Sequence, residues 1–212
     1  WNNFYVWDQC HEEFFQQYRP SANYVRVGYI DMADDGSGIP ESASTFRIAV
    51  FDVSPMRRTL STSLGYSAEL EYYSEKIFKE FSSDIAHLAK NVKSVTILYK
   101  QKRAGNKIRI SAGTRSWLGN LHEVSGITNV HYGVGASRLV DECDGVISMP
   151  FTSTAIIARE KGKPTIYYDP MGKAAPPCDR GIPILRSRDE LIQWAQNILK
   201  ESKRAVRDNM EA

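Results

Sequence analysis

Three consecutive hydroxyl side chains, Thr152, Ser153 and Thr154, follow an apolar run that ends in Pro150 and Phe151. Because proline cannot donate to a strand ladder, we expect the chain to leave its sheet at Pro150 and to begin a helix at the hydroxyls. The first N–H groups of a helix lack intrahelical partners and lie at the positive end of its dipole, so they favour an anion such as phosphate. The alternative is that Thr152 or Ser153 only caps the helix, as these residue types commonly do.

Basic side chains form a second candidate group, in the segment 99–109 that follows the apolar run 95–99. They are Lys100, Lys102, Arg103, Lys107 and Arg109. In a doubly wound sheet this loop and the hydroxyls both follow the carboxyl ends of strands, so we expect them to face one crevice. A phosphate or a sugar carboxylate is the natural partner of such cations, and a solvated turn without a ligand is the alternative.

Alternating strands and helices are predicted around these residues. Apolar runs predict strands at 46–53, 95–99, 128–132, 146–149, 164–169 and 183–185. Helices are predicted at 67–89 with Ser67 as the cap, at 137–143, at 153–161, and at 187–208 behind the capping pattern SRDE. The segment 108–111 is a candidate short strand, and a polar region follows it up to residue 128. These repeated units predict an α/β fold with a Rossmann-like, doubly wound, mainly parallel sheet.

Two loops of this predicted sheet differ from the usual pattern. The loop after residues 46–53 begins at Ser54 and is too long for a tight connection, which makes it a candidate functional loop. Gly133 and Gly135 lack the third glycine of the dinucleotide fingerprint, so a classical dinucleotide site is not expected.

The first 45 residues differ in character from the rest. They contain strand-like segments at 4–8 and 23–30, a helix-like segment at 11–18, and a polar, Gly- and Pro-containing linker at 31–44. We interpret residues 1–45 as the end of a preceding domain plus a linker, and residues 46–212 as the ligand-binding domain. Because the chain opens abruptly on Trp1, we expect it to be a piece of a longer protein.

Composition narrows the class of protein. The chain has 212 residues, of which 42% are hydrophobic and 25% charged, so disorder and fibres are excluded, and a net charge of +2 does not argue for nucleic acid. No apolar run approaches the roughly 20 residues that span a bilayer, and no signal peptide is recognisable, so a cytoplasmic location is expected. Cys10, Cys143 and Cys178 are interpreted as reduced thiols rather than as zinc ligands.

Three sequence motifs carry a resemblance to a known family. They are FDVSP at 51–55, YKQKR at 99–103, and ISMPFTSTA at 147–155 with the following GKPTIYYDP. Together they resemble the surface-polysaccharide biosynthesis proteins named for their PFTS motif, which are glycosyltransferases of the two-domain GT-B type. The resemblance extends from about residue 4 to about residue 198.

The resemblance implies that residues 46 onward form the C-terminal half of a GT-B glycosyltransferase, the Rossmann-like domain that binds the nucleotide-sugar donor. A CMP-sugar is favoured, a UDP-sugar is an alternative, and the sugar would be transferred to a surface glycan acceptor. Bacterial sialyltransferases and Kdo transferases are similar in placing hydroxyl residues at the donor phosphate. The implied substrate-binding residues are Ser54, Lys100, Lys102, Arg103, His131, Tyr132, Gly133, Pro150, Phe151, Thr152, Ser153 and Thr154. Lys100 and Lys102 would lie near the nucleotide or the sugar acid, and the turn from His131 to Gly133 near the base.

The resemblance leaves the catalytic residues unidentified. The acceptor pocket and the base would belong to the missing N-terminal domain, so the isolated piece is expected to be inactive. No metal or other cofactor is expected, since a DxD pair of the kind that holds a divalent ion is missing. Asp34, Asp35 and Gly36 are similar to an acidic motif that supplies the base in some sialyltransferases, but they lie in the predicted linker and are discounted.

Three further alternatives stay open from the sequence. The fold also suits a nucleotide-sugar epimerase, although no acidic and histidine residues of that kind are recognisable, and it suits a nucleotide-sugar binding domain without chemistry. The basic, amphipathic segment 187–208 could also lie on the inner face of a membrane, although such a helix more often packs on its own domain.

Overall fold

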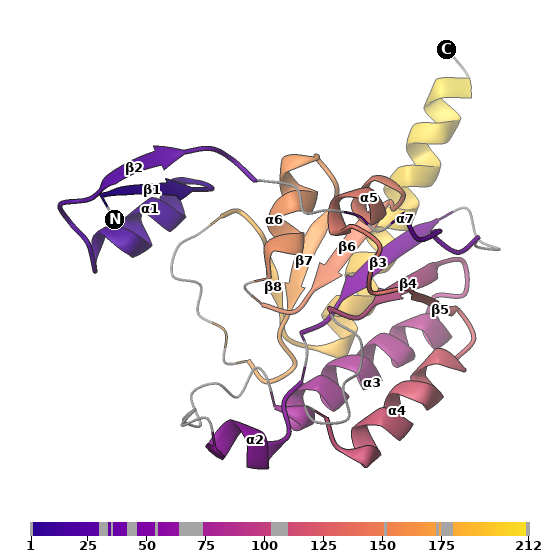
Figure 1. Ribbon diagram of the computed structural model, residues 1–212. Coiled ribbons are helices and arrows are strands. Elements are labelled where there is room, and N and C mark those ends of the chain that lie inside the picture. Colours follow the sequence, from indigo (N-terminus) through magenta and orange to yellow (C-terminus); the bar gives the residue numbers. More distant parts are fainter. Residues whose placement is uncertain are drawn as a thin grey trace.

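The computed structural model describes residues 2–29, 34, 36–41, 46–53, 55–63, 74–102, 110–150, 152–172, 174 and 180–210. Its main feature is a parallel sheet of six strands (Figure 1). These strands are β3 (Arg47–Phe51), β4 (Thr96–Lys100), β5 (Ile127–Val130), β6 (Gly145–Ser148), β7 (Thr165–Tyr168) and β8 (Ile184–Leu185). Their order is β5-β4-β3-β6-β7-β8, the strand order of the Rossmann fold, which confirms the predicted fold class.

Helices cover both faces of this sheet (Figure 1). Helices α3 (Glu75–Asn91), α4 (Ala112–His122) and α7 (Arg188–Met210) lie on one face, and α5 (Ala136–Asp141) and α6 (Ser153–Glu160) lie on the other. Alternate side chains of β3 divide between the two cores, with Ile48 packing toward α3 and Ala49 toward α5. Both are fully buried, as expected for a parallel strand covered on both sides.

Two helices differ from their predicted bounds. The predicted helix 67–89 is observed as α3, and its cap is Ser74, whose hydroxyl accepts from Ile77 N at 3.2 Å; the predicted cap, Ser67, lies outside the described residues. The polar region after residue 111, for which no helix was predicted, contains α4. Leu118 and Leu121 bury one side of this helix, but Gly113 and Gly119 interrupt its apolar pattern.

The candidate strand 108–111 ends in the cap of α4. Ser111 is the N-cap residue, and its hydroxyl accepts from Thr114 N at 3.2 Å. Residues 103–109 lie outside the described part of the chain. A short helix, α2 (Arg58–Ser63), occupies part of the long loop that follows β3.

The predicted strand–helix–strand segment near the N-terminus is confirmed. Strands β1 (Asn3–Val6) and β2 (Asn23–Arg26) pair in parallel, and α1 (Gln9–Gln16) connects them. This unit touches the six-stranded domain through an ion pair between Asp8 and Arg180, with Arg180 Nε 2.8 Å from Asp8 Oδ2. Cys10 in this unit is disulfide-bonded, so the interpretation of the cysteines as reduced thiols is wrong for Cys10. Cys143 is a free, buried thiol.

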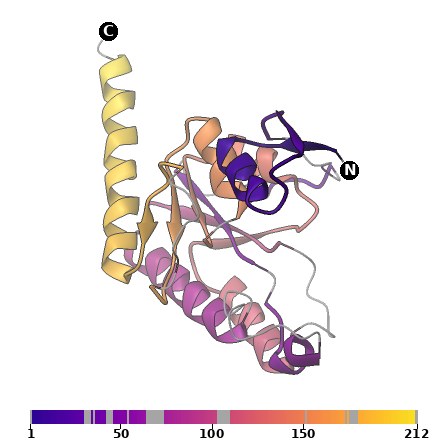
Figure 2. The same ribbon diagram turned by 90° about the vertical axis from the view of Figure 1, so that its left-hand side faces the viewer.

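Helix α7 begins as the capping pattern predicted. Glu190 Oε2 accepts from Ser187 N at 3.0 Å, and Ser187 Oγ accepts from Glu190 N at 3.3 Å. The first half of α7 packs on the sheet so closely that a Cβ added to Gly145 would lie 2.7 Å from Ile198 Cδ1, which explains the glycine there. The second half extends beyond the sheet (Figure 2). Among the described residues, none of the helices is long and apolar enough to cross a membrane.

Candidate functional site

The order of the strands places a crevice between the carboxyl ends of β3 and β6. The connection from β3 runs toward β4 and β5, whereas β6 leads to β7 and β8 on the other side, so the strand order reverses between β3 and β6. In doubly wound sheets, ligands bind at the carboxyl ends of the strands beside this reversal. The residues at these two ends are Asp52 and Val53 after β3, and Met149 and Pro150 after β6.

The predicted hydroxyl turn lies at this position, and two of its three hydroxyls stabilise the turn itself. Thr152 Oγ1 donates to the Met149 carbonyl oxygen at 2.9 Å and lies 3.1 Å from Thr154 Oγ1. Thr154 Oγ1 lies 2.7 Å from the hydroxyl of Ser148, the fully buried last residue of β6. Thr152 and Thr154 therefore connect the start of α6 to the end of its strand.

The N-terminus of α6 differs from those of three other helices. Thr152 is its N-cap residue, yet the Thr152 side chain makes no capping hydrogen bond. By contrast, the N-cap side chains of α1, α3 and α4 each accept a bond from a backbone N–H in the first turn. A helix end without such a partner keeps its N–H groups and positive dipole available to an anion.

Ser153 is the half-buried first residue of α6, which rules out its alternative role as the N-cap. Within the part of the chain that the structure describes, the Ser153 hydroxyl makes no hydrogen bond. Of the three predicted hydroxyls, Ser153 is therefore the one free to bind a ligand.

Lys100 and Lys102, the described residues of the basic segment, lie on the same edge of the sheet as the hydroxyl turn. Lys100 ends β4 and Lys102 follows it, while β3 is the only strand between β4 and β6. Neighbouring strands are about 4.8 Å apart, so the ends of β4 and β6 are roughly 10 Å apart. Lys100 itself is buried, and its charge acts on the neighbouring Asp52 carboxyl.

Asp52 also lies at this crevice, although it was not among the predicted site residues. It follows β3 at the crevice, is buried, and accepts hydrogen bonds from Lys102 N at 2.9 Å and from Tyr99 Oη at 3.1 Å. Burial raises the pKa of Asp52 to about 7, although both hydrogen bonds and the charges of Lys100 and Lys102 favour its ionised form. An acidic residue directly after an apolar strand, at the edge where cations follow the next strand, was the available signal.

The predicted base-binding turn lies on the same edge but farther from α6. His131, Tyr132 and Gly133 follow β5, which is separated from β6 by two strands and thus by roughly 14 Å. His131 Nδ1 accepts from Gly133 N at 3.3 Å and lies 3.0 Å from Ser37 Oγ. The Tyr132 ring is exposed and lies 4.2 Å from the imidazole of His131, measured between ring centroids. Only an extended ligand could contact both this turn and α6.

Helix α5 begins three residues after this turn, and the carboxylate of Asp34 lies at its N-terminus. Asp34 accepts from Gly36 N at 2.8 Å and pairs with Arg138 Nη1 at 3.2 Å. Hydrogen bonds from the Gly36 and Gly135 backbones, together with Arg138, lower the pKa of Asp34. Gly135 is the N-cap residue of α5 and has no side chain to cap it, so Asp34 supplies the negative group at this helix end.

Three predicted binding residues, Ser54, Arg103 and Phe151, lie outside the described residues. Pro150 is buried at the turn after β6, where the chain leaves the sheet as predicted. Within the described part of the chain, no group of three or more His, Cys, Asp or Glu side chains is placed to hold a metal ion.

Comparisons with known proteins agree with the motifs in the sequence. The sequence profile of the family described as "Polysaccharide biosynthesis PFTS motif protein" matches residues 1–195. Among curated protein sequences, none matches the chain.

Solved structures with a similar arrangement include a mutant of S. aureus TarM in complex with fondaparinux, alpha-GlcNAc-glycerol and UDP, with 11% sequence identity and a TM-score of 0.47. Another is E. coli heptosyltransferase WaaC with ADP-2-deoxy-2-fluoro heptose, with 14% identity and a TM-score of 0.42. The similarity covers 93% of this chain and 38% of the TarM chain. For WaaC the corresponding shares are 92% and 56%. This chain therefore spans less than two thirds of either protein.

Proposed function

The chain belongs to the polysaccharide biosynthesis PFTS motif family, and on that premise we propose that its six-stranded domain binds the nucleotide-sugar donor of a GT-B glycosyltransferase. The acceptor is a surface polysaccharide or another glycan. A CMP-sugar is the favoured donor and a UDP-sugar the alternative. Residues 1–45 are the end of the preceding domain plus a linker, and residues 46–212 are the donor-binding domain.

The observation that carries this proposal is the uncapped N-terminus of α6 at the point where the strand order reverses. Thr152 is the right residue type for a cap, but its hydroxyl bonds to Met149, and the Ser153 hydroxyl is left for a ligand. We propose that the phosphate next to the sugar binds at this helix end. The nucleotide extends along the carboxyl edge toward Lys100 and Lys102, and the base lies toward His131 and Tyr132.

The proposed site suits the charge that develops during transfer. When the bond between the sugar carbon and the phosphate oxygen breaks, the leaving nucleotide gains negative charge on that oxygen. The N–H groups of α6, the Ser153 hydroxyl and the lysine ammonium groups stabilise this charge more strongly than that of the intact donor, which lowers the barrier. The attacking hydroxyl and its base belong to the acceptor side.

The N-terminal residues support the division into two domains. β1 and β2 form a parallel sheet of only two strands, and such a small unit is rarely stable by itself. Tyr5 and Tyr18 of this unit are largely exposed. These features suit a unit that continues the sheet and the core of an acceptor-binding domain.

Calorimetry with CMP, UDP and GDP tests the donor site. We expect CMP or UDP to bind, and Ser153→Ala to weaken the binding by roughly threefold to tenfold, the effect of removing one ordinary hydrogen bond. Ser116→Ala on α4 removes an exposed hydroxyl elsewhere and serves as the matched control. Equal affinity in wild type and Ser153→Ala would reject the phosphate role of Ser153.

A further inference from the structure

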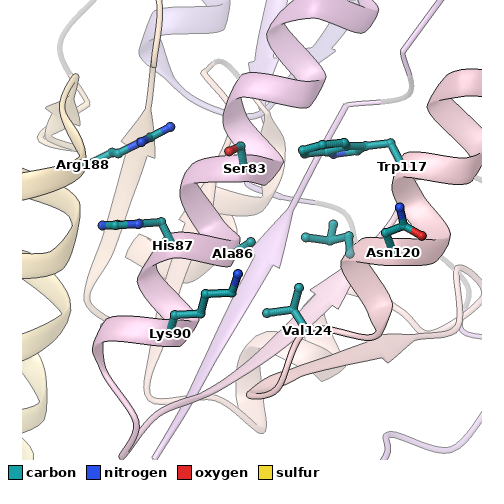
Figure 3. A pocket seen from close by; sticks show the side chains of 9 residues that line it. Ser83, Ala86, His87, Lys90, Trp117, Asn120, Val124 and Arg188 are labelled. Atoms are coloured by element: carbon teal, nitrogen blue, oxygen red, sulfur yellow. The ribbon is translucent and has the colours of Figure 1, made fainter.

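A shallow groove between α3, α4 and the start of α7 offers a second binding surface. It lies on the face of the sheet opposite to α5 and α6. Its floor is the exposed side of α3, where Ser83 and Ala86 leave space between α4 and the start of α7 (Figure 3). The residues around it are Ser83, Ala86, His87 and Lys90 of α3, Trp117, Asn120 and Leu121 of α4, Val124, and Arg188 of α7. The groove lies along the second half of α3, which leads to the amino end of β4. It is therefore remote from the crevice at the carboxyl edge.

The α4 side of the groove combines an aromatic ring with an amide. Trp117 points from α4 toward Ser83 of α3 (Figure 3). Its indole N–H donates to Ser82 Oγ at 2.8 Å. This bond holds the ring in one orientation before any ligand arrives, so little conformational entropy is lost on binding. The Asn120 amide beside it can both donate and accept hydrogen bonds. Apolar surface next to a few polar groups suits the apolar face and the hydroxyl groups of a sugar ring.

The charge of the groove is positive. None of its lining residues is acidic, and two of them, Lys90 and Arg188, are cations. The Arg188 guanidinium pairs with Asp84 of α3, so its charge is largely balanced. Within the described residues, the Lys90 ammonium makes neither a hydrogen bond nor an ion pair, and it points into the space between α3 and α4 (Figure 3). Lys90 is thus available to an anionic group of a ligand.

The groove is small. Its volume is about 250 Å³, just below the range of roughly 300–1,000 Å³ for sites that enclose a whole drug-sized ligand. It therefore suits one unit of a longer chain rather than a complete nucleotide-sugar.

We propose that this groove binds an acidic oligosaccharide, with one sugar unit against Trp117 and Asn120 and its carboxylate or phosphate group at Lys90. The site is separate from the donor crevice, so it would hold a segment of glycan at a distance from the reacting end. Neutral glycans would lack the contact with Lys90 and bind more weakly.

Calorimetric titration of the whole chain with trigalacturonic acid tests this proposal, and maltotriose serves as the neutral control. We expect trigalacturonic acid to bind in the high-micromolar to millimolar range and maltotriose to bind at least about tenfold more weakly. Lys90→Glu should weaken trigalacturonate binding by roughly tenfold. Lys76→Glu makes the same charge change on an exposed position of α3 outside the groove and should leave it unchanged. Asn120→Ala, another exposed position, should weaken it by about threefold.

The groove and the donor crevice can fail separately in this experiment. Ser153→Ala should leave trigalacturonate binding unchanged, and Lys90→Glu should leave nucleotide binding unchanged. The proposal is overturned if trigalacturonic acid does not bind the wild type, if Lys90→Glu and Lys76→Glu bind it equally, or if maltotriose binds as tightly. If the wild type binds trigalacturonic acid but none of the nucleotides, only the proposed function is overturned.

Discussion

Helices α5 and α6 lie on the same face of the sheet and both begin at its carboxyl edge, but their N-termini have different surroundings. Neither helix is capped by the side chain of its own N-cap residue. At α5 a carboxylate from the linker, that of Asp34, bonds to the Gly135 backbone and to Arg138. At α6 the threonines bond back to the strand, and the Ser153 hydroxyl has no partner among the described residues.

The difference shows how the chain can satisfy one helix end internally and leave the other for a ligand. An anion is stabilised at either end by the N–H groups and the helix dipole. At α5 the protein provides that anion from its own linker. At α6 we expect the phosphate of the donor to take the corresponding place.

The largest effect on nucleotide binding is expected from a variant that makes α6 similar to α5. Ser153→Asp puts a carboxylate at the first residue of α6, where it interacts favourably with the dipole and repels a phosphate. We expect CMP or UDP to bind about 100-fold more weakly, or not measurably, while the thermal midpoint stays equal or rises. Calorimetry and thermal melts measure the two effects. Ser153→Asn, which is neutral and similar in size, is the control, and equal losses in both variants would show that charge is not the cause.

The largest effect on stability is expected from Asp52, the buried carboxyl group at the edge near α6. Its pKa is raised to about 7, mainly by burial, so the folded state favours the neutral carboxyl. The preference of the folded state for the neutral Asp52 carboxyl contributes fully to stability below the unfolded pKa near 4. This contribution is lost as the pH rises toward the folded pKa of about 7. The free energy of unfolding should therefore fall between these values by up to about 4 kcal/mol.

Asp52→Asn should remove most of this pH dependence, because an amide does not titrate in this range. Its oxygen can still accept from Lys102 N, and its NH2 group can donate to Tyr99 Oη. Urea unfolding of both proteins between pH 4 and pH 8 measures the slope. The same slope in both would contradict the assignment to Asp52.

A smaller effect on stability distinguishes Thr154, whose hydroxyl bonds within the turn, from Ser153, whose hydroxyl is left for the ligand. Thr154→Val removes the 2.7 Å contact with Ser148 Oγ and leaves that buried hydroxyl without this partner. We expect a loss of about 1–2 kcal/mol in the free energy of unfolding. Ser153→Ala should change it by less than about 0.5 kcal/mol. Urea unfolding tests this ranking, and a larger loss in Ser153→Ala would reverse the assigned roles.

The smallest effect is expected at α5. Asp34→Ala removes the carboxylate from this helix end and breaks the pair with Arg138, which is partly exposed to solvent. We expect a lower thermal midpoint above pH 5 and no difference from the wild type well below the usual pKa of an aspartate, where Asp34 is protonated in both states. Asp141→Ala, which removes another exposed carboxylate with a lysine partner at the end of α5, is the control. A lower midpoint that persists in acid would contradict the role of the charge.

The sheet was predictable because its strands are continuous apolar runs such as Val146–Met149, which only a doubly covered parallel sheet buries well. Helix α4 could not be predicted in this way, since its two glycines and few apolar residues leave a weak periodic pattern. The hydroxyl turn was also predictable in position but not in detail. Whether Thr152 caps the helix or bonds to Met149 depends on a single side-chain rotation.

The roles of Asp52 and Asp34 could not be predicted because they depend on contacts with residues distant in the sequence. Asp52 is buried by strands and loops distant in sequence, and its contact with Tyr99 spans 47 residues. The contact between Asp34 and Arg138 spans 104 residues. Such long-range contacts follow from the tertiary structure rather than from any local pattern.

The central claim is that the N-terminus of α6 binds the donor phosphate, and an amide NMR titration with CMP and UDP tests it most directly. We predict that the backbone N–H signals of Ser153, Thr154 and Ala155 shift progressively with added nucleotide, while that of Asn91, at the end of α3 and away from the carboxyl edge, does not. Nucleotide binding with unchanged signals at Ser153–Ala155 would contradict the claim.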